Sequence, residues 1–123
     1  MAVQKFEDLI VWQKSQDFSV QVYGHFSCCK DYGFKDQITR ASVSISNNIA
    51  EGFERKSNAD FSRFLYFSLG SVSEVRSMLY IAARLEFLSD ENANEMIGKS
   101  NEISKMLYGL LNSLKPNPLT TNP

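Results

Sequence analysis

The sequence predicts an all-α protein that folds as an up-down-up-down, left-handed four-helix bundle. Apolar residues recur at spacings of three and four through four successive stretches, as expected when one face of each helix is buried. Short polar breaks separate these stretches, and two of the breaks end in helix-capping signals. The last stretch alternates steps of four and three residues, a spacing that is typical of left-handed helix packing.

The composition favours one folded domain. The chain has 123 residues, of which 43% are hydrophobic and 12% aromatic, and this is enough for a substantial core. We expect the domain to span residues 1–115. The remaining residues 116–123, PNPLTTNP, are expected to form a frayed tail.

The first helix is expected over residues 8–26 and a loop over residues 27–33. Its apolar stripe consists of Leu9, Trp12, Ser15, Ser19, Val22, Tyr23 and Phe26. Two positions of that stripe are serines, which would let a neighbouring helix approach closely. Phe6 precedes the helix, where it could pack against the first turn as a hydrophobic staple.

The second helix, residues 37–55, carries two kinds of side chain on neighbouring arcs. The core arc consists of Ile38, Ile45, Ile49 and Phe53. The polar arc consists of Gln37, Arg40, Ser44, Asn48, Glu51 and Arg55. An amphipathic surface helix needs only one apolar face, so this polar row predicts contacts beyond the helix's own bundle. Two roles are open for the row. Its side chains either hydrogen-bond one another across a seam between subunits and so fix how the subunits align, or they contact a ligand or RNA.

Gly52 and Ser57 mark the break after the second helix. Gly52 is either the left-handed residue that ends this helix or a place where another backbone comes close. Residues 57–60, SNAD, form a capping box in which the serine accepts from the third helical amide and the aspartate reaches back. A third helix therefore begins near Asn58.

The third helix is expected over residues 58–88, which is roughly 45 Å at 1.5 Å per residue and long for so small a domain. Its apolar residues form two adjoining stripes, wider than a single bundle can cover, so we expect a second subunit to bury the excess. We assign that interface to Phe64, Phe67 and Met78. Gly70 costs about 1 kcal/mol relative to alanine, which tight packing with a neighbour would explain.

Ser89 begins the fourth helix as its N-cap. Asp90 and Glu91 follow it and suit the positive end of the helix dipole. The apolar seam of this helix consists of Met96, Ser100, Ile103, Leu107, Leu110 and Leu114. Pro116 ends the helix.

The motifs indicate neither an enzyme nor a metal or cofactor protein. His25 is the single histidine, and the adjacent Cys28 and Cys29 offer no metal spacing and no disulfide framework. Nucleophile elbows, Gly-rich phosphate loops and Glu-x-x-His di-iron motifs are absent from the sequence. No apolar signal core or membrane-length stretch is present, so we expect a cytoplasmic protein without membrane contact.

The charge balance argues against a general affinity for polyanions. Thirteen Lys and Arg face fourteen Asp and Glu, which gives a net charge of −1. All five arginines nevertheless lie in the central third of the chain, among six acids. These bases either form salt bridges on solvated helix faces or make a weak, salt-sensitive contact to RNA. The candidates for RNA contact are Lys35, Arg40, Arg55, Lys56 and Arg63, and the competing hypothesis is a scaffold that binds only protein.

The second helix also resembles a known family. The string QITRASVSISNNIAEGFER at residues 37–55 resembles the signature of the four-helix-bundle proteins encoded in 23S rRNA intervening sequences. The resemblance extends to FEDL at residues 6–9, WQK at 12–14, FSRFLY at 61–66, LGS at 69–71, Glu74 and LLNSLK at 110–115. The polar signature of the family falls here on Gln37, Arg40, Ser44, Asn48, Glu51 and Gly52.

The resemblance implies a four-helix bundle that assembles as a ring, typically a homopentamer. A relative, the accessory protein of diversity-generating retroelements, forms a basic pentamer that works with a reverse transcriptase and nucleic acid. This chain departs from that relative because its net charge is −1. The partners implied are further copies of the chain and, beyond them, rRNA or a nucleic-acid-processing protein.

Overall fold

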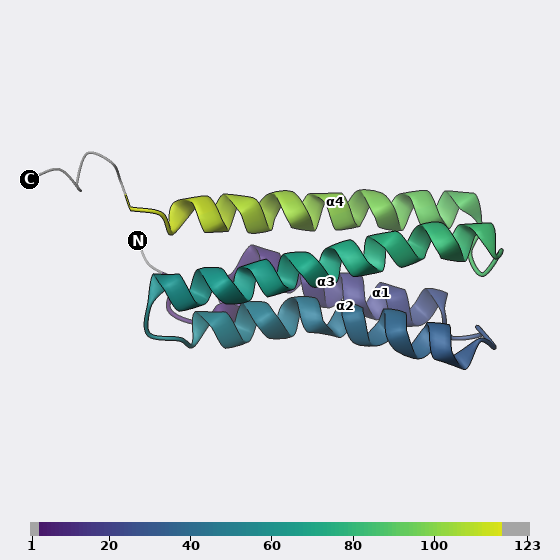
Figure 1. Ribbon diagram of the computed structural model, residues 1–123, viewed down its shortest axis with the longest axis horizontal. Coiled ribbons are helices and arrows are strands. Elements are labelled where there is room, and N and C mark those ends of the chain that lie inside the picture. Colours follow the sequence, from purple (N-terminus) through teal and green to yellow (C-terminus); the bar gives the residue numbers. More distant parts are fainter. Residues whose placement is uncertain (1–2, 117–123) are drawn as a thin grey trace, which may run out of the picture.

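The computed structural model describes residues 3–116, and throughout them the chain is helical or turns between helices (Figure 1). A short 3-10 helix, η1 (Phe6–Asp8), precedes four α-helices: α1 (Ile10–His25), α2 (Tyr32–Phe53), α3 (Asn58–Arg84) and α4 (Asp90–Ser113). Residues 3–116 contain no strand, so the predicted all-α class is confirmed. Apart from Pro116, the tail predicted for residues 116–123 lies outside the described residues.

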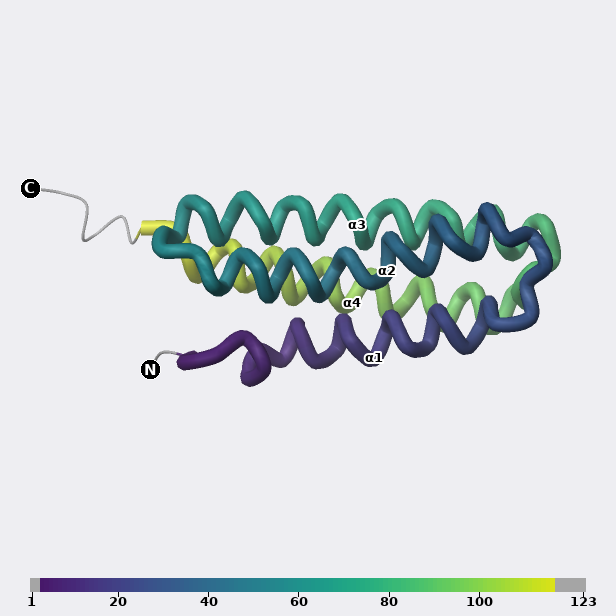
Figure 2. Tube along the Cα trace, turned by 90° about the horizontal axis from the view of Figure 1, so that it is seen from below, coloured from purple at the N-terminus to yellow at the C-terminus, as the bar shows by residue number. Residues whose placement is uncertain are grey.

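The four α-helices lie side by side as a bundle. α1 packs against α2 and α4, and α3 packs against the same two helices. The diagonal pairs, α1 with α3 and α2 with α4, have no Cα atoms within 8 Å of each other. The loops that join successive helices lie at alternate ends of the bundle, as Figures 1 and 2 show. Within residues 3–116, no helix combines the length and the apolar character needed to cross a membrane.

Each helix contributes one apolar stripe to the common core. Ile38, Ile45 and Ile49 of α2 are fully buried, as predicted, and Phe53 is half-buried near the end of the helix. Burial of one such side chain stabilises the fold by about 1.5–3 kcal/mol. The predicted seam of α4 is buried at Met96, Ser100, Ile103 and Leu107 and half-buried at Leu110 and Leu114.

Small hydroxyl residues let the helices approach one another closely. Ser19 of α1 is buried in the predicted stripe, and its hydroxyl lies 3.0 Å from that of Ser42 on α2. Ser68 of α3 donates to the backbone carbonyl of Ile45 on α2 over 2.8 Å. Because these buried hydroxyls have partners, the cost of removing them from water is offset.

The helix starts include two caps that were predicted and one that was not. Ser57 Oγ accepts from the amide of Asp60, and Ser89 Oγ accepts from the amide of Asn92, each at 3.1 Å. Asp31 Oδ1 accepts from the amide of Phe34, also at 3.1 Å. α2 therefore begins at Tyr32, inside the stretch predicted as a loop. The glycine at position 33 favours a loop, but a capped first turn tolerates it.

α3 ends at Arg84, before the end that the sequence predicts at Leu88. The chain leaves the helix through Glu86, whose φ of 62° is left-handed. The amide of Phe87 donates to the carbonyl of Ala82 at 2.8 Å, and the amide of Glu86 donates to the carbonyl of Ala83 at 3.1 Å. These two bonds form a Schellman motif. A glycine usually marks this left-handed position, and a glutamate gives no such signal in the sequence.

Gly52 lies where α3 packs directly against α2. None of the glycines in the described residues has a positive φ, so Gly52 does not end its helix by a left-handed turn. It is buried, and a side chain at this position would meet Phe61 and Phe64 of α3. Of the two predicted roles, the structure therefore shows the close approach.

Candidate functional site

Side chains of the polar stripe of α2 form hydrogen bonds to α3. We define this stripe as Gln37, Arg40, Ser44, Asn48, Glu51 and Gly52. Ser71 of α3 donates to Ser44 Oγ over 3.1 Å, and Gln37 Nε2 donates to Glu74 Oε2 over 3.3 Å. Asn48 Nδ2 donates to both the carbonyl and the hydroxyl of Ser44, at 2.8 and 3.0 Å. The stripe thus ties two helices of one subunit together.

The two charged members of the polar stripe, Arg40 and Glu51, pair with residues one helical turn away in the chain. Arg40 lies 2.9 Å from Asp36, and Arg55 lies 3.0 Å from Glu51. Exposed pairs of this kind contribute at most about 1 kcal/mol each. Among residues 3–116, no buried side-chain nitrogen or oxygen lacks a hydrogen-bond partner. The polar groups of the stripe thus find partners within one subunit, and the two predicted roles, a subunit seam or a contact with a ligand or RNA, stay predictions.

The five predicted RNA-contact residues do not gather in one place. Lys35 and Arg40 belong to the first half of α2, whereas Arg55, Lys56 and Arg63 surround the turn between α2 and α3. Lys35 and Arg55 are twenty residues apart on one helical path, or about 30 Å at 1.5 Å per residue. Lys35 Nζ also donates to the carbonyl of Ser27 over 3.1 Å, which holds it against the preceding loop.

The group at the turn forms an arginine–phenylalanine cluster, which we define as Arg55, Arg63, Phe64 and Phe67. The Arg55 guanidinium lies 4.7 Å from the centre of the Phe64 ring, and that of Arg63 lies 5.0 Å from it. Arg63 is also 5.6 Å from the ring of Phe67. Glu51 and Asp60 partly neutralise the two arginines, at 3.0 and 3.6 Å. The cluster thus stacks two partly exposed arginines on aromatic rings at the surface.

The predicted subunit interface is only partly exposed. Phe64 and Met78 are buried within the subunit, at 7% and 6% exposure, whereas Phe67 is 49% exposed. A second subunit could reach Phe67 but not the other two, because the packing of α3 against its own bundle already covers them. The surface of α3 instead presents an apolar α3 face, made of Tyr66, Phe67, Tyr80, Ile81 and Leu85. They form two groups, Tyr66 with Phe67 in the first half of α3, and Tyr80 with Ile81 and Leu85 at its end. At 100° per residue both groups fall on the side of the helix away from the core, and this signal was available in the sequence.

A second apolar surface lies between α1 and α2. Tyr23 is 49% exposed, although the sequence placed it in the buried stripe of α1, because the neighbouring Val22 takes the core position. Tyr23, Val20 and Val43 line a shallow groove, and Val20 is 70% exposed. We call these three residues the α1–α2 face. Gln16 Nε2 donates to Ser46 Oγ over 2.9 Å and closes the base of this groove.

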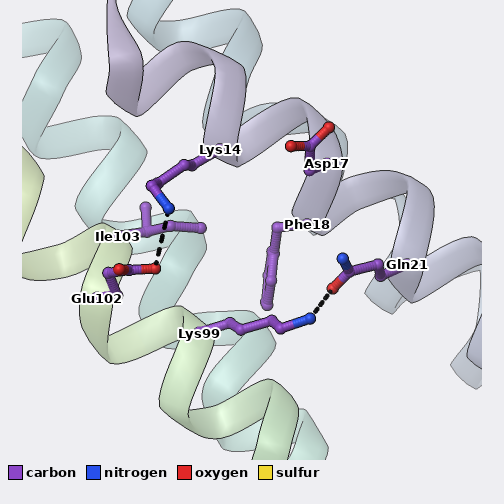
Figure 3. Close-up of a pocket in the computed structure, with 7 residues that line it drawn as sticks. All are labelled: Lys14, Asp17, Phe18, Gln21, Lys99, Glu102 and Ile103. Carbon is purple, nitrogen blue, oxygen red and sulfur yellow. Dashed lines mark hydrogen bonds and ion pairs between the residues drawn. The ribbon is translucent and has the colours of Figure 1, made fainter.

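A third surface feature is a cleft of about 200 Å³ between α1 and α4 (Figure 3). Lys14 of α1 lies 3.6 Å from Glu102 of α4, and Lys99 of α4 donates to Gln21 Oε1 of α1 over 2.7 Å. Figure 3 shows the ring of Phe18 between these two bridges. This cleft was not predictable from the sequence, since its residues on α1 and α4 lie far apart in the chain.

The described residues contain no group of three or more His, Cys, Asp or Glu side chains that could hold a metal ion. Cys28 and Cys29 are free thiols, the first exposed and the second half-buried. The chemistry at the surface therefore consists of paired charges, exposed aromatic rings and apolar grooves.

Comparison with known proteins shows the family to which the chain belongs. The family model of the 23S rRNA-intervening sequence protein matches residues 7–109. A crystal structure from Bacteroides thetaiotaomicron is similar, with 29% sequence identity and a TM-score of 0.78, and its title gives a protein with unknown function from the S23 ribosomal protein family. The similarity covers 83% of this chain and 98% of that chain. No curated protein matches the sequence.

Proposed function

This chain belongs to the family of 23S rRNA-intervening sequence proteins, and we propose that it acts by binding rather than by catalysis, with further copies of itself as its first partner. The proposed assembly is a closed ring of up-down-up-down, left-handed bundles. The number of subunits, five, follows from the family resemblance. This ring would be a scaffold whose repeated surfaces engage further macromolecules.

The observation that supports self-association is the presence of two different exposed apolar faces. The α3 face is carried by α3 and the α1–α2 face mainly by α1, and these two helices are diagonal in the bundle, with no Cα atoms within 8 Å of each other. Large side chains on each are about half exposed, such as Phe67 and Tyr23 at 49% each. Apolar patches of this kind are typical of protein interfaces.

Two unlike faces favour a ring over a dimer. In a two-fold dimer the same patch of both subunits meets, so a second apolar face would stay uncovered. When the α3 face of one subunit packs on the α1–α2 face of the next, every subunit uses both faces. Such head-to-tail contacts close into a ring when the rotation per subunit divides a full turn, and they form a filament otherwise.

Light scattering on the purified chain tests the assembly. One chain weighs 14.0 kDa, so five copies give about 70 kDa. Phe67→Asp should shift the mass towards 14.0 kDa while the helical circular dichroism is kept. The matched control is Tyr32→Asp, which changes an exposed ring at the start of α2, outside both faces. A wild-type mass of one chain at micromolar concentration would contradict the proposal.

The second candidate function is a weak contact to RNA, and the arginine–phenylalanine cluster favours it. Arg55, Lys56 and Arg63 come together at one end of the bundle, so a ring would repeat the cluster around one rim. Five modest patches acting together could bind where a single patch could not. The neighbouring Glu51, Glu54 and Asp60 oppose this contact because they neutralise the same bases.

Filter binding against structured rRNA fragments at two salt concentrations tests this contact. Binding through phosphates must weaken steeply with salt, and Arg55→Gln or Arg63→Gln should lower the slope of affinity against salt. Lys35→Gln is the control, because Lys35 lies at the other end of α2. No binding at low salt would leave the protein scaffold as the function.

A further inference from the structure

Asp17 of α1 is an exposed acid that has no partner in its own subunit. Among the described residues, its carboxylate makes no hydrogen bond and no ion pair. Figure 3 shows that this carboxylate points away from Phe18, Ile103 and Lys99. The bridges between α1 and α4 do not involve it. The charge of Asp17 is therefore free to meet a residue of another molecule.

Asp17 lies at the edge of the α1–α2 face. Val20 follows it by three residues, so the two side chains lie on the same side of α1, with Cβ atoms about 5–6 Å apart. Val20 is 70% exposed, and none of the described residues that line the groove from Val20 to Tyr23 and Val43 is charged. The α1–α2 face thus has an apolar centre and an acidic edge.

The first half of the α3 face carries a base at the corresponding place. Arg63 precedes Phe67 by four residues, and its guanidinium lies 5.6 Å from the centre of the Phe67 ring. The ion pair of Arg63 with Asp60 is 3.6 Å long, and both side chains are about half exposed, so this pair is weak. A guanidinium has five N–H donors, which leaves donors for a second acid. This part of the α3 face thus has an apolar centre and a basic edge.

The direction of the helices brings these two edges to the same side of a contact. α1 and α3 run in the same direction, because the loops lie at alternate ends of the bundle (Figure 2). Rotation about an axis that runs roughly along the bundles keeps α3 of one copy parallel to α1 of the next. In both helices the charged residue precedes the apolar residue by about one turn. When Phe67 packs beside Val20, Arg63 and Asp17 therefore lie on the same side of that contact.

Assembly makes an unpaired acid at this edge costly. Packing of the α3 face on Val20 takes Asp17 partly out of water, and a charge that loses water without gaining a partner opposes association. Arg63 is placed to supply that partner, because it contacts the ring of Phe67. Arg84, by contrast, lies at the other end of α3.

We propose that Arg63 of one copy forms an ion pair with Asp17 of the next copy and so fixes how the α3 face aligns with the α1–α2 face. The partner is a second copy of this chain, and the inference rests on the proposed head-to-tail ring. Every contact of the ring contains one such pair. A contact in which the two faces slide by one helical turn separates the charges, so the pair selects one alignment over its neighbours.

Charge reversal in the full-length chain tests the pair. Sedimentation equilibrium measures the self-association constant at low ionic strength, where charge pairs are least screened. Asp17→Arg and Arg63→Glu each place like charges at the contact and should weaken association at least about tenfold. The double variant restores a pair of opposite charges and should recover the wild-type constant to within about threefold.

Control variants separate this pair from a general effect of charge. Glu95→Arg makes a similar reversal at an exposed position of α4, outside both faces, and should leave association unchanged. Asp17→Arg combined with Arg84→Glu should not recover association, because Arg84 lies at the other end of α3. Helical circular dichroism checks that each variant is folded. If a reversed variant does not fold, Asp17→Asn and Arg63→Gln remove the charges without repulsion and should each weaken association by about threefold or more.

The outcomes distinguish the pair from the ring itself. The pair is overturned if the wild type associates and the single variants associate equally well, or if the folded double variant stays dissociated. Either result leaves the ring standing. A wild-type chain that remains a monomer contradicts the ring and the pair together.

Discussion

Gly52 of α2 lies directly against Phe64 of α3. A Cβ atom added at Gly52 would come within 2.6 Å of the Cβ of Phe64, and it would be 3.0 Å from Cδ1 of Phe61. Carbon atoms do not approach so closely without movement of the backbone. The absence of a side chain at Gly52 therefore sets the spacing of α2 and α3 at the end where the arginine–phenylalanine cluster forms.

Gly52→Ala is expected to destabilise the protein by about 1–3 kcal/mol, because it overpacks a close helix contact. The sign is informative, since a glycine-to-alanine change within an unobstructed helix stabilises it by about 1 kcal/mol. Urea unfolding followed by circular dichroism at one fixed protein concentration measures the change.

Gly70→Ala is the matched control for this substitution. Gly70 is also inside a helix, but no atom lies within 4 Å of the position that its Cβ would take. The alanine should therefore stabilise the subunit by about 0.5–1 kcal/mol. Equal effects of the two substitutions would show that the packing of Phe64 against Gly52 does not limit stability.

Glu86→Gly is expected to stabilise the protein by about 0.5–1 kcal/mol. Glu86 has a φ of 62°, which strains a residue with a Cβ but not glycine. Glu91→Gly, in the first turn of α4, should instead destabilise by about 1 kcal/mol, because it places glycine inside a helix. Thermal unfolding of both variants measures the two effects, and a loss of stability in Glu86→Gly would contradict the left-handed assignment.

Asp31→Ala is expected to cost about 1 kcal/mol of stability, because it removes the side chain that caps α2. Asp36→Ala removes only an exposed pair with Arg40 and should cost less than about 0.5 kcal/mol. Similar losses for the two variants, measured by urea unfolding, would argue that α2 does not begin at the Asp31 cap.

The helices were predictable where apolar residues recur at helical spacing or where a capping residue marks a helix start. The periodic burial of Ile38, Ile45 and Ile49 and the caps at Ser57 and Ser89 follow from spacing and residue type alone, and the structure confirms them. The end of α3 was not predictable, since Glu86 adopts a conformation for which its side chain gives no signal. The predicted family is confirmed by the match over residues 7–109.

The surfaces were less predictable, because they depend on how the helices rotate against one another. Phe64 and Phe67 lie one helical turn apart, yet Phe64 packs on Gly52 and Phe67 faces solvent. Both residues lie near the edge of the apolar arc of α3, and their spacing in the sequence does not tell which of the two is buried. The α1–α4 cleft likewise depends on Phe18 and Lys99, which only the fold brings together.

Cross-linking between the two apolar faces tests the proposed head-to-tail ring most directly. The test uses a chain in which Cys28 and Cys29 are changed to serine and which carries both Val20→Cys and Phe67→Cys, treated with a short bismaleimide. α1 and α3 are diagonal within one subunit, with no Cα atoms within 8 Å of each other, and a link inside one subunit would leave the chain at its monomer mass on a denaturing gel, so only links between subunits give larger species. The proposal predicts a ladder of covalent oligomers that ends at five chains, whereas either cysteine alone gives no cross-link. A ladder that fails to form, or dimers formed by a single-cysteine variant, would contradict it.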